Sequence, residues 1–241
     1  MASIKALDDR RNYIILEDAE AVLFAANQFI EIAKKAILDR GQFVVALSGG
    51  STPRAIFQEL LHYKKDIDWS LVKIFWSDER AVPPTSSESN YKMAMDTAFG
   101  ELVLPENVFR MPAEKDLETE SLQYESFIQE TCLAFDLVML GMGDDGHTAS
   151  LFPYSKALDI EGRLVVPNWV ESKKTWRMTL TYEGIHRSRA IIFYVFGKNK
   201  AEEIATVLKG PPHFHEYPSQ AVGTKKNPAL WLLDKSAASC L

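Results

Sequence analysis

The first indication of the fold is the stretch Phe43-Val44-Val45-Ala46-Leu47-Ser48-Gly49-Gly50-Ser51-Thr52-Pro53. Its five apolar residues in a row, with two adjacent valines, predict a buried strand. The two glycines allow a sharp turn, and Pro53 is suited to the start of the helix that the pattern predicts over 54–63. A buried strand followed directly by a helix is typical of proteins with a parallel sheet.

The same alternation of strands and helices continues on both sides of this stretch. Strand patterns occur at 72–76, 108–111, 136–140, 175–181, 190–196 and 231–233, and helical periodicity at 18–38, 90–99, 118–132 and 199–208. This order predicts an α/β fold in which helices cover both faces of a largely parallel sheet. No linker, shift of composition or repeat divides the chain, so we expect residues 1–241 to form a single domain.

The composition limits the function classes. The net charge is −6 and the sequence pI is about 5.5, whereas a protein that binds nucleic acid normally presents a basic face. The two cysteines, Cys132 and Cys240, are too far apart and too few for a disulfide framework or a zinc site. The chain has no signal-peptide pattern and no apolar run long enough to span a membrane, so we expect a cytoplasmic protein.

Three polar turns follow predicted strands, and in parallel sheets such turns meet at one edge, where ligands bind. In the first, the glycines and hydroxyls of Gly49-Gly50-Ser51-Thr52 are suited to holding a phosphate or a sugar at a helix start. A capped strand–helix turn without a ligand is the alternative. In the second, Arg80 can bind an anion bidentately and Asp78 a sugar hydroxyl, unless the two simply belong to a solvated charged loop.

The third turn, Gly141–Ser150, contains the histidine that we consider the best catalytic candidate. It matches the GxGxxG pattern of dinucleotide-binding proteins, but Asp144 and Asp145 would place negative charge where a pyrophosphate must sit. His147 instead follows Asp145 by two positions, an arrangement in which the carboxylate can fix the tautomer of a general base. A structural histidine is the alternative.

Lys200 is the remaining basic candidate, because it stands near the start of a helix that follows a buried strand. There it can neutralise a phosphate, or it can belong to a solvated helix face. The pair His213 and His215 lacks nearby partners for a metal site, so we expect no metal.

Taken together, these segments resemble the 6-phosphogluconolactonase family, within the wider group that includes glucosamine-6-phosphate isomerase/deaminase. The resemblance extends from about residue 20 to residue 235 and keeps the order of the family's motifs. The matching segments are Ala46–Pro53, Trp76–Pro83, Ser89–Tyr91, Leu140–Pro153, Arg177–Thr181 and Gly197–Ala201.

The resemblance implies a three-layer α/β/α fold with a mostly parallel, Rossmann-like sheet, and an enzyme without metal or organic cofactor. Its reaction is the hydrolysis of 6-phospho-D-glucono-1,5-lactone to 6-phosphogluconate in the oxidative pentose phosphate pathway. It implies His147 as the general base with Asp145 beside it. Substrate contacts are implied for Gly49, Gly50, Ser51, Thr52, Asp78, Arg80, Arg177 and Lys200. We expect a monomer that binds neither nucleic acid nor membranes.

Two other functions are weighed against this one. The isomerase/deaminase follows the histidine with Asn-Glu-Pro, whereas this chain has Leu151-Phe152-Pro153, and an apolar Phe152 cannot relay protons. A non-catalytic sugar-phosphate-binding module, as in some transcriptional regulators, would add a helix-turn-helix. The roughly 20 residues before the first predicted helix leave no room for that motif. We therefore expect the lactonase.

Overall fold

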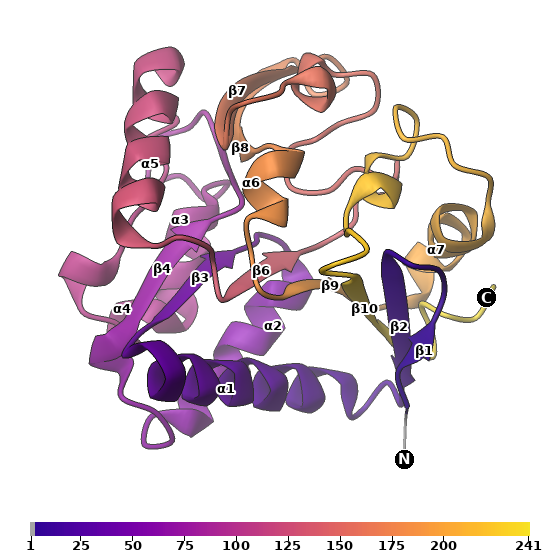
Figure 1. The fold of residues 1–241 in the computed structure, drawn as a ribbon, viewed down its shortest axis with the longest axis horizontal. Coiled ribbons are helices and arrows are strands. Elements are labelled where there is room, and N and C mark those ends of the chain that lie inside the picture. Colours follow the sequence, from indigo (N-terminus) through magenta and orange to yellow (C-terminus); the bar gives the residue numbers. More distant parts are fainter. Residues whose placement is uncertain (1–2) are drawn as a thin grey trace.

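The computed structural model describes residues 3–241, and its centre is a seven-stranded sheet (Figure 1). The strands stand in the order β1-β2-β10-β9-β6-β3-β4, and all neighbours are parallel except the pair β1 and β2. Their bounds are β1 Lys5–Ala6, β2 Arg11–Leu16, β3 Phe43–Leu47, β4 Val72–Trp76, β6 Leu137–Leu140, β9 Ile191–Val195 and β10 Ala229–Asp234. The largely parallel sheet is therefore confirmed.

Helices cover both faces of this sheet, which gives the expected three-layer α/β/α arrangement. In Figure 1, α1 and α2 lie on one side of the sheet, and α5 and α6 lie on the other. The helices are α1 Ala21–Arg40, α2 Ser51–Leu60, α3 Asn90–Ala94, α4 Gly100–Leu102, α5 Leu117–Thr131, α6 Tyr182–His186 and α7 Ala201–Lys209. A π-helical turn, Met95–Phe99, continues α3, and short 3₁₀ turns occupy Leu61–Tyr63, Trp69–Leu71, Pro105–Asn107, Lys156–Asp159, Lys198–Lys200 and Pro218–Ala221.

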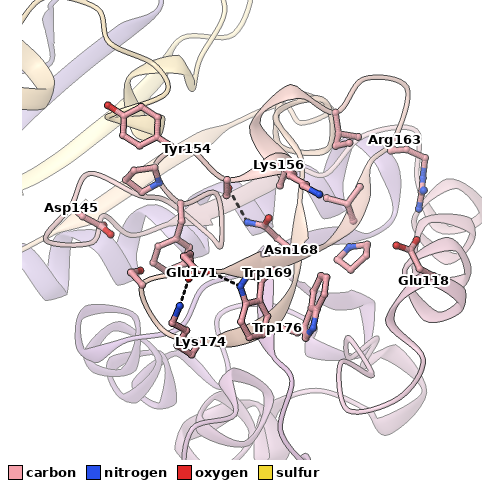
Figure 2. A pocket seen from close by; sticks show the side chains of 18 of the residues that line it. Glu118, Asp145, Tyr154, Lys156, Arg163, Asn168, Trp169, Glu171, Lys174 and Trp176 are labelled. Atoms are coloured by element: carbon pink, nitrogen blue, oxygen red, sulfur yellow. Dashed lines mark hydrogen bonds and ion pairs between the residues drawn. The ribbon is translucent and has the colours of Figure 1, made fainter.

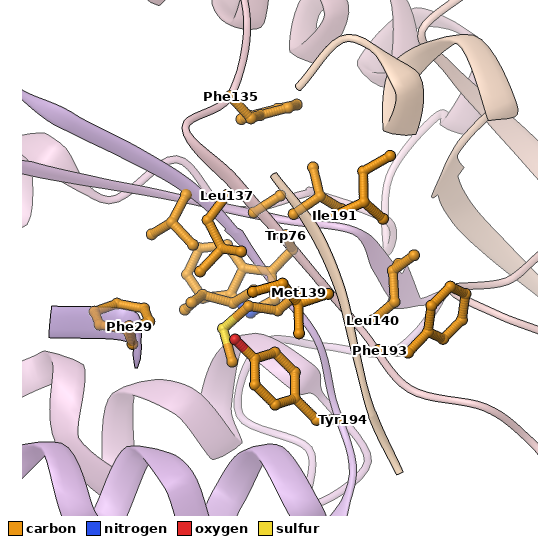
Figure 3. Packing of buried hydrophobic residues seen from close by; sticks show 14 of the residues in the cluster. Phe29, Trp76, Phe135, Leu137, Met139, Leu140, Ile191, Phe193 and Tyr194 are labelled. Atoms are coloured by element: carbon orange, nitrogen blue, oxygen red, sulfur yellow. The ribbon is translucent and has the colours of Figure 1, made fainter. Parts of the chain in front are cut away.

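The central strands are buried on both faces because a helical layer covers each side. Every residue of β3, β6 and β9 is buried, which explains their unbroken apolar sequences. Figure 3 shows part of this core, where Trp76 and Tyr194 lie near Met139 of β6. The rings of Phe193 and Trp231 stack with their centroids 3.9 Å apart across β9 and β10. The apolar segments thus form the core of the protein, and this core holds the strands, and with them the edge where they end, in place.

A second, three-stranded antiparallel sheet was not predicted. Its order is β5-β8-β7, with β5 Asp78–Arg80, β8 Thr175–Leu180 and β7 Val165–Val170. The chain leaves the seven-stranded sheet at the buried Ser77, whose amide donates to Leu47 O at 2.8 Å. The segment Asp78–Arg80, expected to be a polar turn after β4, is therefore a strand paired with β8.

Two further details differ from the sequence-based expectations. Residues 108–111 form no strand, because only Val108 makes an isolated bridge, to Ile74. The helix after the first turn begins at Ser51 rather than at residue 54, so Pro53 lies within its first turn. Within residues 3–241, no helix has the length and apolar character needed to cross a membrane.

Candidate active site

The turn between β3 and α2 brings backbone close to other parts of the site. Gly50 caps the start of α2 with a φ of 105°, a conformation that favours glycine. A Cβ atom at Gly49 would overlap the side-chain oxygen of Asn90, so glycine is required for this close approach. Asn90 is buried at the start of α3. The first predicted turn therefore packs directly against a residue that the sequence analysis did not select.

The turn after β6 holds His147 beside Asp145. Nδ1 of His147 contacts Oδ1 of Asp145, which also accepts the backbone N–H of His147 at 3.2 Å. The imidazole stacks on Phe152, with centroids 3.9 Å apart and planes inclined by 19°. A Cβ atom at Gly143 would overlap the imidazole atoms Cε1 and Nδ1. The ring is thus in close contact with both Gly143 and Phe152.

The charge state of Asp145 suits this pairing. Burial raises the pKa of Asp145, but the hydrogen bond and charge of His147 outweigh it, and the pKa lies below its ordinary value. Asp145 is therefore ionised near neutral pH and accepts a hydrogen bond from Nδ1–H. The other ring nitrogen, Nε2, is then left as the proton acceptor of the neutral imidazole.

Asp78 is buried on β5 and is tied to the turn that holds His147. Its Oδ2 accepts the hydroxyl of Ser150 at 2.6 Å, and Asn90 Nδ2 donates to its carbonyl oxygen at 2.9 Å. Ser150 follows Ala149, whose φ of 48° is rare for a residue with a side chain. Strained backbone of this kind gathers at functional sites. The hydrogen bond from Ser150 to Asp78 thus connects the turn after β6, in the seven-stranded sheet, with β5 of the three-stranded sheet.

Arg80 and Arg177 lie at paired positions of β5 and β8. Burial lowers the pKa of Arg177, the charge of Arg80 lowers it further, and the charge of Asp78 opposes both. The Nε atoms of both arginines are buried and have no hydrogen-bond partner within residues 3–241. Two guanidinium groups with unused donors side by side form a place where an anion is favoured.

A pocket of about 180 Å³ gathers five of the predicted residues: Gly49, Gly50, Asp78, Arg80 and His147. The other lining residues are Ser48, Asn90, Gly141, Met142, Gly143 and Ala149. An adjoining cavity of about 440 Å³ shares Gly50, Arg80 and Asn90 with the pocket and adds Ser51 and Arg54. Arg54 stands directly after the predicted turn, and that position was the only signal in the sequence that could have marked it.

The other predicted residues lie outside this pocket. Thr52, Arg177 and Asp145 line neither of these two cavities. Lys200 lies in the 3₁₀ turn Lys198–Lys200 directly before α7, where its ammonium contacts the carboxylate of Asp144. Within residues 3–241, no group of three or more metal-ligating side chains is arranged to hold a metal ion.

A much larger cavity, of about 1290 Å³, is bordered by Asp145 and Phe152. Figure 2 shows Asp145 at one end, Trp169 and Trp176 along its length, and Glu118 at the other end. His147 and the arginines Arg80 and Arg177 do not line it. We place the chemistry in the smaller pocket, because only there do the imidazole, a buried carboxylate and a guanidinium meet.

Comparison with known proteins gives consistent matches. The model of the family described as glucosamine-6-phosphate isomerases/6-phosphogluconolactonase matches residues 17–231. A 6-phosphogluconolactonase of Chlamydia trachomatis serovar D is 41% identical over 244 residues, covering 100% of this chain and 93% of that protein. One of Synechocystis sp. is 34% identical, covering 86% and 88%. The crystal structure of 6-phosphogluconolactonase from Thermotoga maritima has 28% identity and a TM-score of 0.82, covering 92% and 99%.

Proposed function

The chain belongs to the glucosamine-6-phosphate isomerase/6-phosphogluconolactonase family, and we propose that it is a lactonase of that family. It hydrolyses 6-phospho-D-glucono-1,5-lactone to 6-phosphogluconate in the oxidative pentose phosphate pathway. The observation that supports this most directly is the His147–Asp145 pair, whose imidazole faces a pocket shared with Asp78 and Arg80. A base, a hydrogen-bonding carboxylate and a cation are the groups that a phosphorylated lactone requires.

In the mechanism that we propose, His147 is the general base. Nε2 takes a proton from a water molecule as its oxygen attacks the lactone carbonyl, and Asp145 stabilises the imidazolium that forms. When the tetrahedral intermediate collapses, the imidazolium returns this proton to the ring oxygen as the C–O bond breaks. The product is an open-chain carboxylic acid, and the histidine is neutral again.

The developing oxyanion needs hydrogen-bond donors in the same pocket. We assign this role to the backbone N–H of Gly50, the residue that caps the start of α2 and lines this pocket, since the N–H groups at a helix start have no acceptor within the helix. The glycine at position 50 exposes this backbone to the pocket. The positive end of the α2 dipole acts in the same direction. Asp78 accepts a sugar hydroxyl, which orients the ring relative to His147.

For the phosphate, we propose the adjoining cavity. Arg80 lines both cavities, while Ser51 and Arg54 line only the second. Arg177 adds positive charge from the strand paired with β5. This concentration of arginines supplies the local positive charge that a chain with a net charge of −6 needs to bind an anion. For Lys200 the role of phosphate ligand stays a prediction, and it requires the ammonium to leave Asp144.

The isomerase/deaminase reaction is disfavoured by Phe152. Its ring stacks on the imidazole of His147 and is 5% exposed, so an apolar group occupies the place where that enzyme carries a glutamate. The expected proton relay for ring opening is therefore missing. No residue within 3–241 that lines the pocket besides Asp78 carries a carboxylate to replace it.

We also propose that residues 1–241 act as one catalytic domain, because the two sheets contribute to the same pocket. Gly49 and His147 follow strands of the seven-stranded sheet, while Asp78 and Arg80 belong to the three-stranded sheet. A monomer in the cytoplasm is the form that we propose for the active enzyme.

The proposed function is tested by measuring hydrolysis of the phosphorylated lactone against its spontaneous rate, alongside turnover of glucosamine-6-phosphate. We expect enzymatic hydrolysis of the lactone and no turnover of the amino sugar. Turnover of the amino sugar without lactone hydrolysis would overturn the proposal.

A further inference from the structure

Glu79 lies between two proposed substrate-binding residues but lines neither cavity. It is 4% exposed, and its two oxygens accept four hydrogen bonds. The donors are Arg80 N, Asn90 N and Tyr91 N at 2.8 Å each, and Ser89 Oγ at 2.9 Å. Burial raises the pKa of Glu79, and these four donors, none of them a cation, oppose the shift. A buried carboxylate held in this way fixes the backbone around it.

The first consequence concerns Arg80. Glu79 holds the Arg80 backbone through the N–H group of that residue. The Arg80 guanidinium is held separately, because Nη1 donates to the carbonyl oxygen of Glu88 at 2.6 Å. Glu88 directly precedes Ser89, which Glu79 also holds. Both the backbone and the guanidinium of Arg80 therefore depend on the same buried carboxylate. The Nε atom of Arg80 has no hydrogen-bond partner among residues 3–241.

The second consequence concerns Asp78. The backbone N–H of Asn90 donates to Glu79, and the Asn90 side chain donates to Asp78 O at 2.9 Å and to Oδ1 at 3.3 Å. The same side chain packs on Gly49 with no space for a Cβ atom. Displacement of Asn90 would therefore move the carboxylate of Asp78 and the turn before α2.

We propose that Glu79 is a positioning residue that places the Arg80 guanidinium for the phosphate and the Asp78 carboxylate for the sugar. This inference rests on the proposed function, since the ligands of both groups are taken from it. Glu79 itself touches no substrate. It acts by holding the segment 88–91 against β5, so that two side chains from one strand enter the pocket in fixed directions.

The substitution Glu79→Gln tests this role because it keeps the size of the side chain and removes its charge. Its amide has one acceptor oxygen, and its NH₂ group would face N–H and O–H donors. At least one of the hydrogen bonds to residues 89–91 is then lost. We expect Arg80 to lose its fixed position, and the preference for a phosphorylated ligand to fall.

The readout is the ratio of affinities for 6-phosphogluconate and gluconate, measured by calorimetry, with kcat and KM of lactone hydrolysis measured in parallel. We expect Glu79→Gln to lower this ratio about tenfold or more, and Arg80→Ala to lower it at least as much. In the double variant, Glu79→Gln should add no further loss to that of Arg80→Ala, because both act on the same group. Additive losses, or an unchanged ratio in Glu79→Gln, would overturn the inference.

Asp136→Asn is the matched control. Asp136 is also 4% exposed and accepts hydrogen bonds from Val44 N and Arg40 Nε, both at 2.9 Å. It precedes β6, at the opposite end of the sheet from the pocket. We expect this variant to lose thermal stability with an unchanged affinity ratio, which separates positioning from general destabilisation.

If Glu79→Gln does not fold, Ser89→Ala removes one of the four donors to Glu79, together with the side-chain cap of α3 and a hydroxyl at the wall of the adjoining cavity, and keeps the buried charge. It should lower the affinity ratio in the same direction by a smaller factor, and an unchanged ratio would count against the inference. Binding of the acids needs no turnover, so the two proposals fail separately. A wild-type chain that prefers 6-phosphogluconate but hydrolyses no lactone refutes the proposed function alone. A wild-type chain without that preference refutes the role of Glu79.

Discussion

The substitution Gly143→Ala provides a sharp test of His147 as the base, because it acts on the imidazole without altering any titratable group. A Cβ atom at position 143 would overlap Cε1 and Nδ1 of His147. The backbone of Gly143 does not have a positive φ, so alanine fits it without strain. The added methyl therefore displaces the ring and also presses on the carboxylate of its partner Asp145, whose Oδ1 would lie 2.9 Å away.

The size of the effect follows from the distances. Two carbon atoms pack at about 3.5–4.0 Å, so the ring must move by about 1 Å or more. The ring of Phe152 already stacks on the imidazole with the centroids 3.9 Å apart, and the contact with Asp145 holds Nδ1. A misplacement of about 1 Å can cost a reaction about 100-fold, and complete loss of a general base about 10²–10⁴-fold. We expect kcat to fall by about 100-fold or more, equivalent to about 3 kcal/mol of activation free energy.

The assay is steady-state hydrolysis of the phosphorylated lactone, corrected for the spontaneous reaction, with thermal unfolding as the check on folding. Gly141→Ala is the comparison within the same turn, because its Cβ atom would meet nothing nearer than Ser48 Oγ at 3.9 Å. We expect a much smaller loss of kcat in that variant. Equal kcat values for Gly143→Ala and the wild type would refute the argument that the position of this imidazole limits catalysis.

Further predictions concern the same groups. His147→Ala should lower kcat by about 10²–10⁴-fold with a smaller change in KM, and near-normal kcat in steady-state assays would remove this residue from the role of base. Asp145→Asn should also lower kcat, because an amide neither fixes the Nδ1–H tautomer nor stabilises the imidazolium. The pKa of Asp145 is lower in the folded state than its ordinary value. Its carboxylate therefore stabilises the fold above about pH 4, the ordinary aspartate pKa. This contribution to stability is lost as the pH falls through the folded-state pKa. Thermal unfolding across this range should show less acid destabilisation for Asp145→Asn than for the wild type, and identical profiles would contradict the assignment. Arg54→Ala should raise KM for the phosphorylated lactone with little change in kcat, while KM for the unphosphorylated glucono-1,5-lactone stays the same. Equal changes of KM for both substrates would exclude Arg54 as a phosphate ligand.

The sequence alone determined the parallel sheet and predicted most of the candidate site at its edge. Unbroken apolar runs such as Phe43–Leu47 predict strands buried on both faces. The turn after such a run ends where the next helical pattern begins. Since parallel strands align their carboxyl ends, the turns with Gly49, Asp78 and His147 had to meet. The pairing of His147 with Asp145 was predictable too, because two residues on one glycine-rich turn are neighbours whatever the rest of the chain does.

Only the tertiary structure decided the three-stranded sheet and what it brings to the pocket. Asp78–Arg80 is too short and too charged to show the alternation of a strand, and it pairs with residues far along the chain. That pairing sets Arg177 beside Arg80, and the segment 89–91, distant in sequence, supplies three of the four hydrogen bonds to the buried Glu79. The partner of Lys200 likewise depends on two loops that only the folded chain brings together. The local sequence pattern predicts which residues follow a strand. Contacts between segments that are distant in sequence depend on how the folded chain packs, and the pattern of one segment does not predict them.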